Sequence, residues 1–427
     1  MVNIFIISVF VAGYIAIAFE HKIKVNKTAT ALLTAVFCWA LVAVQECLRC
    51  GPHQYIEVVL QNLNRHLHDI AQVIIFLMGA MTIVELIDSH GGFKIITDFI
   101  RTKDKRKLLW AISIFTFLLS SVLDNLTTSI VMVSLLRRLV PDRDDRMIFA
   151  GMVIIAANAG GAWSPIGDVT TTMLWIGGQV TAGKLMELLI IPSLVSLVVP
   201  LLYFSFSIKQ GVYPDSSQST DSPAQYGAKR VFSLGIGSLI FVPIFRAVTN
   251  LPPFMGILLG LGIMWVLTDL IHQERDDLKV PRILTRIDFS SILFFLGILL
   301  AVAALETAGI LGSLALRMDN YFNNKDIIVT VMGLLSAIID NVPLTAATMG
   351  MYSLSSYPAD SKLWEMIAYS VGTGGSILII GSAAGVVVMG MEKISFGWYL
   401  KKVSLPVLIG YLLGIGSFLM IYHVIYG

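Results

Sequence analysis

The sequence predicts an all-α membrane protein built from inverted five-span repeats, each with a re-entrant hairpin and a broken helix. Three observations lead to this fold class: long apolar runs, a one-sided distribution of Lys and Arg, and matching polar motifs in the two halves of the chain. The chain is 56% hydrophobic and only 14% charged. Because a typical soluble domain carries roughly 25% charged residues, this chain lacks the charge needed to cover a water-facing surface.

About ten spanning helices are expected, because runs of about 20 apolar residues match the hydrocarbon core of a bilayer. They lie near residues 2–19, 28–46, 70–88, 146–180, 185–208, 230–248, 254–271, 289–308, 362–391 and 403–425. The fourth and ninth runs are too long and too rich in glycine for simple helices, so each predicts a broken helix. Stretches 107–140 and 326–357 each hold two short apolar segments around a polar centre, which favours a re-entrant hairpin.

Most of the 30 Lys and Arg residues fall on one side of these spans. The few on the other side are Arg49, Arg65, Lys184, Arg246, Arg317, Lys325 and Lys362. Because Lys and Arg accumulate on the cytoplasmic side, this predicts a multi-pass inner-membrane protein with both termini on the periplasmic side. The lipid bilayer is the expected partner. Nucleic acid is not, because the basic residues lie in short loops between apolar runs.

The two halves of the chain carry the same motifs in the same order. The matched positions are Gly79 and Gly297, Asp124 and Asp340, and Gly160 and Gly374. An odd number of spans in each half makes the halves insert with opposite orientations. The predicted parts are a first repeat at 1–208, a cytoplasmic linker at 209–229 and a second repeat at 230–427.

Interrupted helices at matching positions of inverted repeats are how secondary transporters build a midplane site with alternating access. The sequence therefore predicts a secondary transporter and not an enzyme, with no cofactor. Its transport part is expected at about 107–180 and 326–391, and its scaffold in the remaining spans.

Four polar segments interrupt the apolar background. They are Ser120–Thr128, Asn158–Thr171, Ser336–Thr345 and Gly372–Ser382. Most of them combine a helix breaker with oxygen-bearing side chains. Gly and Pro free backbone carbonyls at membrane depth, and such backbone is tolerated only where it lines a cavity or packs on protein. Freed carbonyls and Asn, Ser and Thr oxygens are hard ligands that suit Na⁺ or Li⁺.

Asp124, Asp168 and Asp340 indicate a cationic cargo. A carboxylate at the bilayer centre costs about 2.5–3.5 kcal/mol on insertion scales, and no Lys or Arg lies in the four polar segments to offset it. A desolvated carboxylate holds a proton when no cation is present and releases it when one arrives. Competition of H⁺ and Na⁺ for one site is the minimal physics of an antiporter. Helix capping is the alternative role for any one of the three.

Other polar residues support these aspartates. Ser336 precedes Asp340 by one helical turn and shares its face. Thr170 and Thr171 follow Asp168 and complete its coordination shell, or else bond back to their own helix. The secondary candidates are Thr128, Ser164, Thr345, Ser382 and Glu85. For Glu85, near the cytoplasmic end of the third span, an exposed helix end is the alternative.

Two further groups of residues are weaker signals. His66 and His68 are expected in a solvated outer loop, with a pH sensor as the alternative. Cys47 and Cys50 form a single CxxC motif. Without a second pair it does not favour a transition-metal site, and a loop disulfide stays open.

The chain resembles the NhaD-type Na⁺/H⁺ antiporters of the ion transporter superfamily. The resemblance is carried by Asp124–Thr128, Asn158–Thr171 and Asp340–Thr345, and extends from about residue 60 to the C-terminus. It implies exchange of Na⁺ or Li⁺ for H⁺, a homodimer, the two-hairpin fold of the dicarboxylate transporters in the same superfamily, and an elevator-like movement. The ion-binding positions that it implies are Asp124, Asn125, Asn158, Asp168, Thr170, Thr171, Ser336, Asp340, Asn341 and Ser376.

Two departures from related patterns refine this expectation. The dicarboxylate branch has Ser-Asn-Thr at its hairpin tips, whereas here Asp124 and Asp340 stand at the serine position, which disfavours an anionic substrate. The second half has Ser382 where the first has Asp168, so the halves are not equivalent ion sites. The alternatives are a metalloid or anion permease such as an arsenite exporter, a passive channel, and an intramembrane aspartyl protease.

Overall fold

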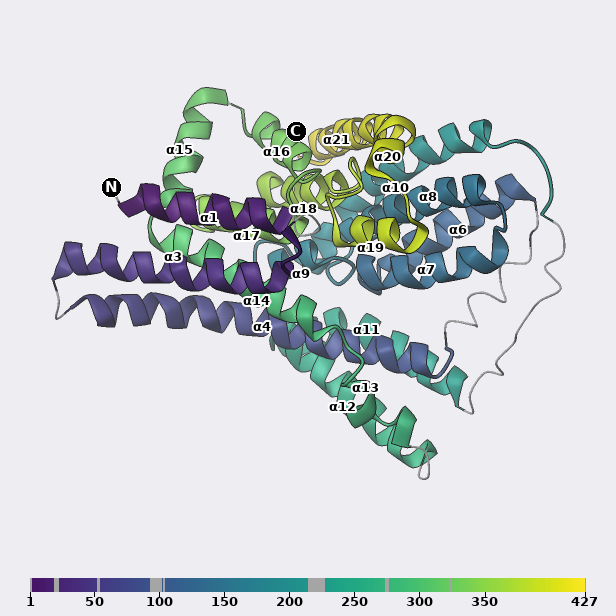
Figure 1. Cartoon of the computed structure of the whole chain (residues 1–427), viewed down its shortest axis with the longest axis horizontal. Coiled ribbons are helices and arrows are strands. Elements are labelled where there is room, and N and C mark those ends of the chain that lie inside the picture. Colours follow the sequence, from purple (N-terminus) through teal and green to yellow (C-terminus); the bar gives the residue numbers. More distant parts are fainter. Residues whose placement is uncertain are drawn as a thin grey trace. The chain divides into compact units, whose positions relative to one another are not determined.

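The chain is described by a computed structural model over residues 2–18, 23–51, 54–92, 102, 104–213, 227–272, 276–322 and 324–426. Helices form most of these residues (Figure 1). The described part contains no β-strand, and its one isolated bridge joins Asp104 to Val212. The all-α prediction is confirmed. Within the predicted linker at 209–229, residues 214–226 lie outside the described part.

Helices form within every predicted span and hairpin, and those at Val280–Ile283, Ile310–Phe322 and Phe396–Lys402 were not predicted. The helices are α1 (Val2–Ala18), α3 (Lys27–Cys50), α4 (Tyr55–Ser89), α6 (Lys105–Ser120), α7 (Asn125–Leu139), α8 (Arg143–Ala162), α9 (Val169–Ile176), α10 (Ala182–Ser207), α11 (Ala228–Thr249), α12 (Pro253–Ile271), α13 (Val280–Ile283), α14 (Phe289–Thr307), α15 (Ile310–Phe322), α16 (Lys325–Leu335), α17 (Asn341–Met351), α18 (Lys362–Gly374), α19 (Ala383–Glu392), α20 (Phe396–Lys402) and α21 (Ser404–Tyr426), with a 3₁₀ turn at Asp276–Leu278. The pairs α6–α7 and α16–α17 are the predicted helical hairpins. The pairs α8–α9 and α18–α19 are the predicted broken helices.

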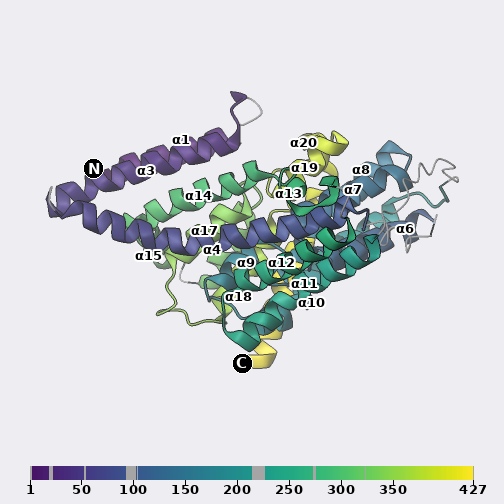
Figure 2. The same cartoon turned by 90° about the horizontal axis from the view of Figure 1, so that it is seen from below.

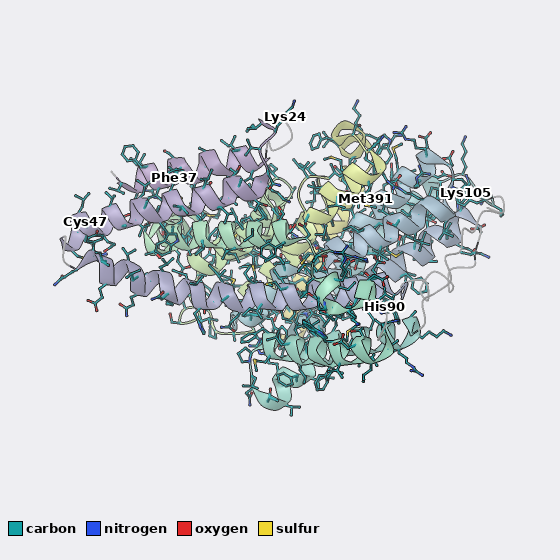
Figure 3. The ribbon with its side chains drawn as sticks, turned by 60° about the horizontal axis from the view of Figure 1, so that its bottom comes forward. Lys24, Phe37, Cys47, His90, Lys105 and Met391 are labelled. Carbon is teal, nitrogen blue, oxygen red and sulfur yellow. The ribbon has the colours of Figure 1, made fainter. Side chains whose placement is uncertain are left out.

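Seven of the described helices are long and apolar enough to cross a membrane. They are α3, α4, α10, α11, α12, α14 and α21. Their exposed surfaces are apolar as well: on α3, Val36 is 67% exposed and Phe37, labelled in Figure 3, is 57% exposed. Water would penalise such a surface, whereas lipid tails solvate it. The chain is therefore a multi-pass membrane protein.

One compact unit is formed by residues 1–78, 288–328 and 342–358. In it, α3 packs along α1 and α14 (Figures 1 and 2). A glycine explains how closely α14 approaches α3, because a Cβ at Gly297 would lie 2.8 Å from the backbone nitrogen of Leu32. The Trp39 indole fixes the same pair of helices by donating from Nε1 to the Leu300 carbonyl at 2.9 Å.

Helix α4 differs from its prediction. The expected span at 70–88 is part of a continuous helix of 35 residues that begins at Tyr55. The expected loop position of His66 is wrong: this side chain lies in α4, is buried, and places Nε2 3.1 Å from Thr307 Oγ1. Its ring also packs edge-on against Trp39. The segment before residue 70 contains polar residues, so the sequence did not indicate a buried helix there. Its burial comes from packing on helices that are distant in the sequence.

The CxxC motif also lies in a helix. Cys47 and Cys50 belong to the last turn of α3, at the end remote from Lys24 (Figure 3), and neither forms a disulfide.

The second compact unit is formed by residues 79–287, 329–341 and 359–427. Helix α8 is its buried centre: from Phe149 to Ala162 every residue is buried. It contacts α6, α7, α10, α18 and α19, and α10 packs along α21. Buried on all sides, α8 carries the first break into the protein interior.

Glycines let each broken helix meet its hairpin in the same way. A Cβ at Gly160 would lie 2.2 Å from the Phe117 carbonyl oxygen, and one at Gly374 would lie 2.0 Å from the Gly333 carbonyl oxygen. Both approaches are too close for any side chain. A second glycine repeats the contact in each half; the pairs are Gly167 with Ser120 and Gly381 with Ser336. The two halves thus share their local packing. Their opposite orientation in the membrane stays a prediction.

Candidate ion-binding site

Asp168 lies in the first break, immediately before α9. Its side chain is 2% exposed and makes no capping hydrogen bond to its own helix. Instead, Oδ1 accepts from Asn125 Nδ2 at 3.2 Å, and Oδ2 lies 3.4 Å from Asn341 Nδ2. The carboxylate is therefore contacted by amides from both hairpins.

The two asparagines reach Asp168 from equivalent positions. Asn125 is the first residue of α7 and Asn341 is the first residue of α17. Each follows an aspartate at the turn of its hairpin, and each is buried. Because α7 and α17 both start beside the first break, their first side chains lie next to Asp168. The fold therefore converts two matched sequence motifs into two donors for one carboxylate.

Asn158 connects the two breaks. This side chain of α8 is fully buried, and its Oδ1 accepts from Asn125 Nδ2 at 3.0 Å. Its Nδ2 donates to Ser376 Oγ at 2.8 Å and to Ser382 Oγ at 2.9 Å, both in or beside the second break. With these three bonds the amide is held firmly, since a buried polar group left unpaired would cost about 1–3 kcal/mol.

Ser336 supports Asn341 from the end of α16. Its Oγ lies 2.8 Å from both Asn341 Oδ1 and the Val371 carbonyl oxygen. A hydroxyl has one hydrogen, so it donates to only one of these acceptors at a time. The first half has a similar contact, in which Ser120 Oγ donates to the Ala157 carbonyl at 2.6 Å.

These contacts define the amide–carboxylate cluster. Its members are Asn125, Asn158, Asp168, Ser336, Asn341, Ser376 and Ser382. It contains no basic residue, and among the described residues no Lys, Arg or His forms an ion pair with Asp168. Neutral amides orient a carboxylate but do not cancel its charge. Only a proton or a metal cation can do so, and the oxygens nearby are the hard ligands that such a cation prefers.

The threonines that follow Asp168 differ in their contacts. Thr171 Oγ1 bonds back to the Asp168 carbonyl at 3.0 Å, which is the back-bonding alternative. The hydroxyl of Thr128 is buried and forms no hydrogen bond of standard geometry with the described residues, whereas the buried Thr170 side chain lies beside the Asp168 carboxylate.

Asp124 is used differently from Asp168. Its carboxylate caps α7, accepting from the Thr127 backbone nitrogen at 2.8 Å and from Thr127 Oγ1 at 2.6 Å. These contacts correspond to the capping alternative. Asp340 holds the matching place before α17 and is half-buried.

The secondary candidates outside the cluster have local contacts. Ser164 Oγ accepts from the Ile166 nitrogen at 3.4 Å within the first break. Glu85 accepts from Ser89 Oγ at 3.2 Å near the end of α4. Thr345 is buried in the first compact unit.

The buried acid Glu365 was missed from the sequence. Glu365 of α18 is 0% exposed, and its carboxyl group lies close to that of Asp360. It lies two turns before Gly372, where a Cβ would be 3.6 Å from Asp168 Oδ2. The signal was present, because Glu365 is an acidic residue within the predicted span 362–391. It was passed over because it stands outside the helix break.

Known proteins match this chain over most of its length. A family model described as citrate transporter (CitMHS) matches residues 14–366. Sodium/proton antiporter 1 of Arabidopsis thaliana is 50% identical over 417 residues, covering 96% of this chain and 71% of the relative. Sodium/proton antiporter 2 of the same plant is 48% identical over 419 residues, covering 96% and 98%. The Na⁺/H⁺ antiporter NhaD of Alkalimonas amylolytica is 29% identical over 448 residues, covering 97% and 90%.

These matches agree with the resemblance to NhaD-type antiporters, and they extend over 96–97% of this chain. The chain therefore belongs to the CitMHS family and is a homologue of the NhaD-type Na⁺/H⁺ antiporters.

Proposed function

We propose that this protein exchanges Na⁺ or Li⁺ for H⁺ across the membrane, with Asp168 as the shared site. The observation that carries the proposal is a buried carboxylate contacted by one amide from each hairpin, with no basic partner among the described residues. The names of its relatives agree with it, since plant and bacterial homologues are called sodium/proton antiporters.

Competition at one carboxylate explains coupling. When Na⁺ binds, Asp168 is ionised, and the hydroxyl and carbonyl oxygens nearby complete the coordination. When H⁺ binds, the carboxyl group is neutral and the cation leaves. The empty, ionised state is costly inside a bilayer, by about 2.5–3.5 kcal/mol on insertion scales. The site therefore crosses the membrane loaded with one ion or the other, which enforces exchange.

Alternating access is proposed to occur by an elevator-like movement of a homodimer. The moving part consists of the hairpins and broken helices at about 107–180 and 326–391. Hydrogen bonds of Asn158 and Asn341 hold the two breaks and a hairpin end to one another, so these parts can move as a body. The distribution of Lys and Arg supports an inner-membrane location with periplasmic termini.

An anion carrier is the second function to test, because the matching family model is described as a citrate transporter. An anion would require positive charge at the site, whereas the cluster contains a carboxylate and no basic side chain. Arsenite, the cargo of the metalloid alternative, belongs in the same test. Everted vesicles that report proton movement with a pH-sensitive dye should respond to Na⁺ and Li⁺, and not to K⁺, citrate or arsenite.

Asp168→Asn should abolish the Na⁺-dependent proton release while the protein remains folded in the membrane, and Asp340→Asn is expected to do the same. Asp269→Asn, which changes an exposed carboxylate on α12, is the matched control and should keep activity. Proton movement driven by citrate, or full Na⁺ response in Asp168→Asn, would refute the proposal.

A further inference from the structure

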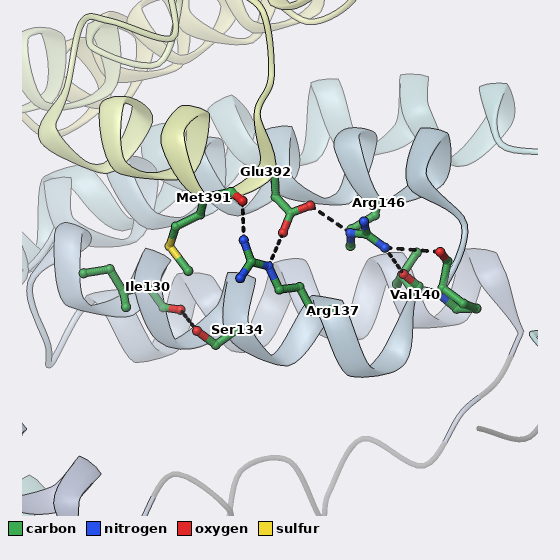
Figure 4. A network of polar contacts seen from close by, with 8 residues as sticks. Ile130, Ser134, Arg137, Val140, Arg146, Met391 and Glu392 are labelled. Atoms are coloured by element: carbon green, nitrogen blue, oxygen red, sulfur yellow. Dashed lines mark hydrogen bonds and ion pairs between the residues drawn. The ribbon is translucent and has the colours of Figure 1, made fainter. Parts of the chain in front are cut away.

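A basic cavity lies apart from the amide–carboxylate cluster. It has a volume of about 370 Å³ and is lined by Arg137, Arg143, Arg146, Met391, Glu392 and Lys393. These residues come from the end of α7, the start of α8 and the end of α19 (Figure 4). Four cationic side chains and one carboxylate thus line the same cavity. The volume is within the roughly 300–1,000 Å³ of small-molecule pockets.

Glu392 fixes the orientation of two guanidinium groups. Its carboxylate is 3% exposed and accepts from Arg137 Nε and Arg146 Nε, each at 2.8 Å. Arg137 Nη2 also donates to the Met391 carbonyl, and Arg146 Nη1 donates to the Val140 carbonyl at 3.0 Å. Arg137 Nη1 and Arg146 Nη2 take no part in these bonds. Both guanidinium groups are therefore held in place, and each keeps N–H donors that these bonds do not use.

The other two cations are placed at the exposed side of the cavity. Arg143 and Lys393 are exposed and form no ion pair with any described residue. Lys393 ends α19 in the left-handed conformation, with φ of 50°. After α9 the corresponding turn contains Gly178, with φ of 80°. A lysine is less favourable for folding than glycine at such a backbone position.

The positive-inside rule accounts for basic residues at this end of the helices, each solvated separately. It does not account for a cavity lined by two oriented guanidinium groups, those of Arg137 and Arg146, together with two further basic side chains. Guanidinium groups match phosphate oxygens in bidentate geometry, and Lys adds a point charge. We propose that this basic cavity binds a phosphate group, carried by a lipid headgroup or by a soluble phosphate compound.

The location gives such a ligand a structural effect. It would join the ends of α7 and α8, from the first half, to the end of α19, from the second half. Helix α19 is capped at its start by Ser382, whose hydroxyl accepts from Asn158 in the cluster. Occupation of the cavity would therefore stabilise the helix that carries part of the ion site. The inference does not depend on the identity of the transported ion.

Binding should be measured on the full chain in phosphatidylcholine nanodiscs at constant ionic strength. Inorganic phosphate is titrated in one series, and phosphatidylglycerol replaces part of the lipid in another. Thermal unfolding and equilibrium binding are the readouts. The test variant is Arg143→Gln with Lys393→Gln, because neither side chain forms an ion pair among the described residues. Lys401→Gln with Lys402→Gln, in the neighbouring α20, is the control with the same loss of charge.

The native protein should show saturable stabilisation. Loss of two charged donors should raise the dissociation constant about tenfold or more in the test variant and leave the control unchanged. A response to inorganic phosphate supports a soluble ligand, and a response to phosphatidylglycerol alone supports a lipid headgroup. The proposal is overturned if neither ligand binds, if the test variant binds as the native protein does, or if citrate or chloride at equal ionic strength binds as well as phosphate.

Discussion

Asn125 and Asn341 occupy matching positions at the starts of α7 and α17, and they face different oxygens of the Asp168 carboxylate. The asparagine of the repeated Asp-Asn motif therefore contacts the same carboxylate from both hairpins. The second half has no equivalent carboxylate, because Ser382 stands where the first half has Asp168. Both halves of the chain contribute to the amide–carboxylate cluster, and neither forms it alone.

Removing either hairpin amide should weaken Na⁺ binding. A hydrogen bond to a charged group contributes about 1.5–3 kcal/mol, so Asn125→Ala or Asn341→Ala should raise the Na⁺ concentration for half-maximal proton release about tenfold or more. The two effects should not add in the double variant, because both amides act on Asp168. Asn64→Ala, at an exposed position of α4, is the control. Unchanged half-maximal concentrations in both single variants would contradict this role.

Asp124 allows helix capping to be separated from ion binding. Asn caps a helix about as well as Asp, whereas Ala at this position costs about 0.5–2 kcal/mol. If capping of α7 is the whole role, Asp124→Asn should retain exchange and thermal stability, and Asp124→Ala should lose stability. Thermal unfolding and vesicle exchange measure the two properties side by side. Loss of exchange in a stable Asp124→Asn protein would instead show that the charge itself is required.

Close packing of α8 on its hairpin should be intolerant of a methyl group. In Gly160→Ala the new Cβ would lie 2.2 Å from the Phe117 carbonyl oxygen, so the backbone must move. Overpacking of this kind costs about 1–3 kcal/mol, which should appear as a lower unfolding temperature. Gly390→Ala in α19 is the control, because nothing lies within 4 Å of its added Cβ. That control should be neutral or stabilising by about 0.5–1 kcal/mol. Equal unfolding temperatures for the two variants would show that the contact is not tight.

Glu365→Gln tests whether the buried acid takes part in proton movement. Glutamine has nearly the same shape and is cheaper to bury, so the unfolding temperature should stay the same or rise. The pH dependence of Na⁺/H⁺ exchange should become less steep, because one titrating group near the ion path is gone. Glu57→Gln changes an exposed acid of α4 and should leave the profile unchanged. An identical pH profile in Glu365→Gln would show that the acid takes no part in proton movement.

The sequence determined the elements of this protein, because membrane helices are encoded locally. Apolar runs located the spans, and Gly, Pro and Asn motifs located the hairpins and the breaks, since each acts on its own backbone. Where burial depended on distant partners, local patterns failed. His66 is an example: it looks like a loop residue until Thr307 and Trp39 pack around it.

The tertiary structure decided which acid is contacted by amides from both hairpins. Asp124, Asp168 and Asp340 were equivalent in the sequence, because each is an acid in a polar break. In the folded chain Asp124 bonds its own helix, whereas Asp168 faces amides that are far away along the chain. Whether a carboxylate caps its own helix or accepts from amides far along the chain depends on its neighbours in space. Only the packing of hairpins against breaks supplies those neighbours.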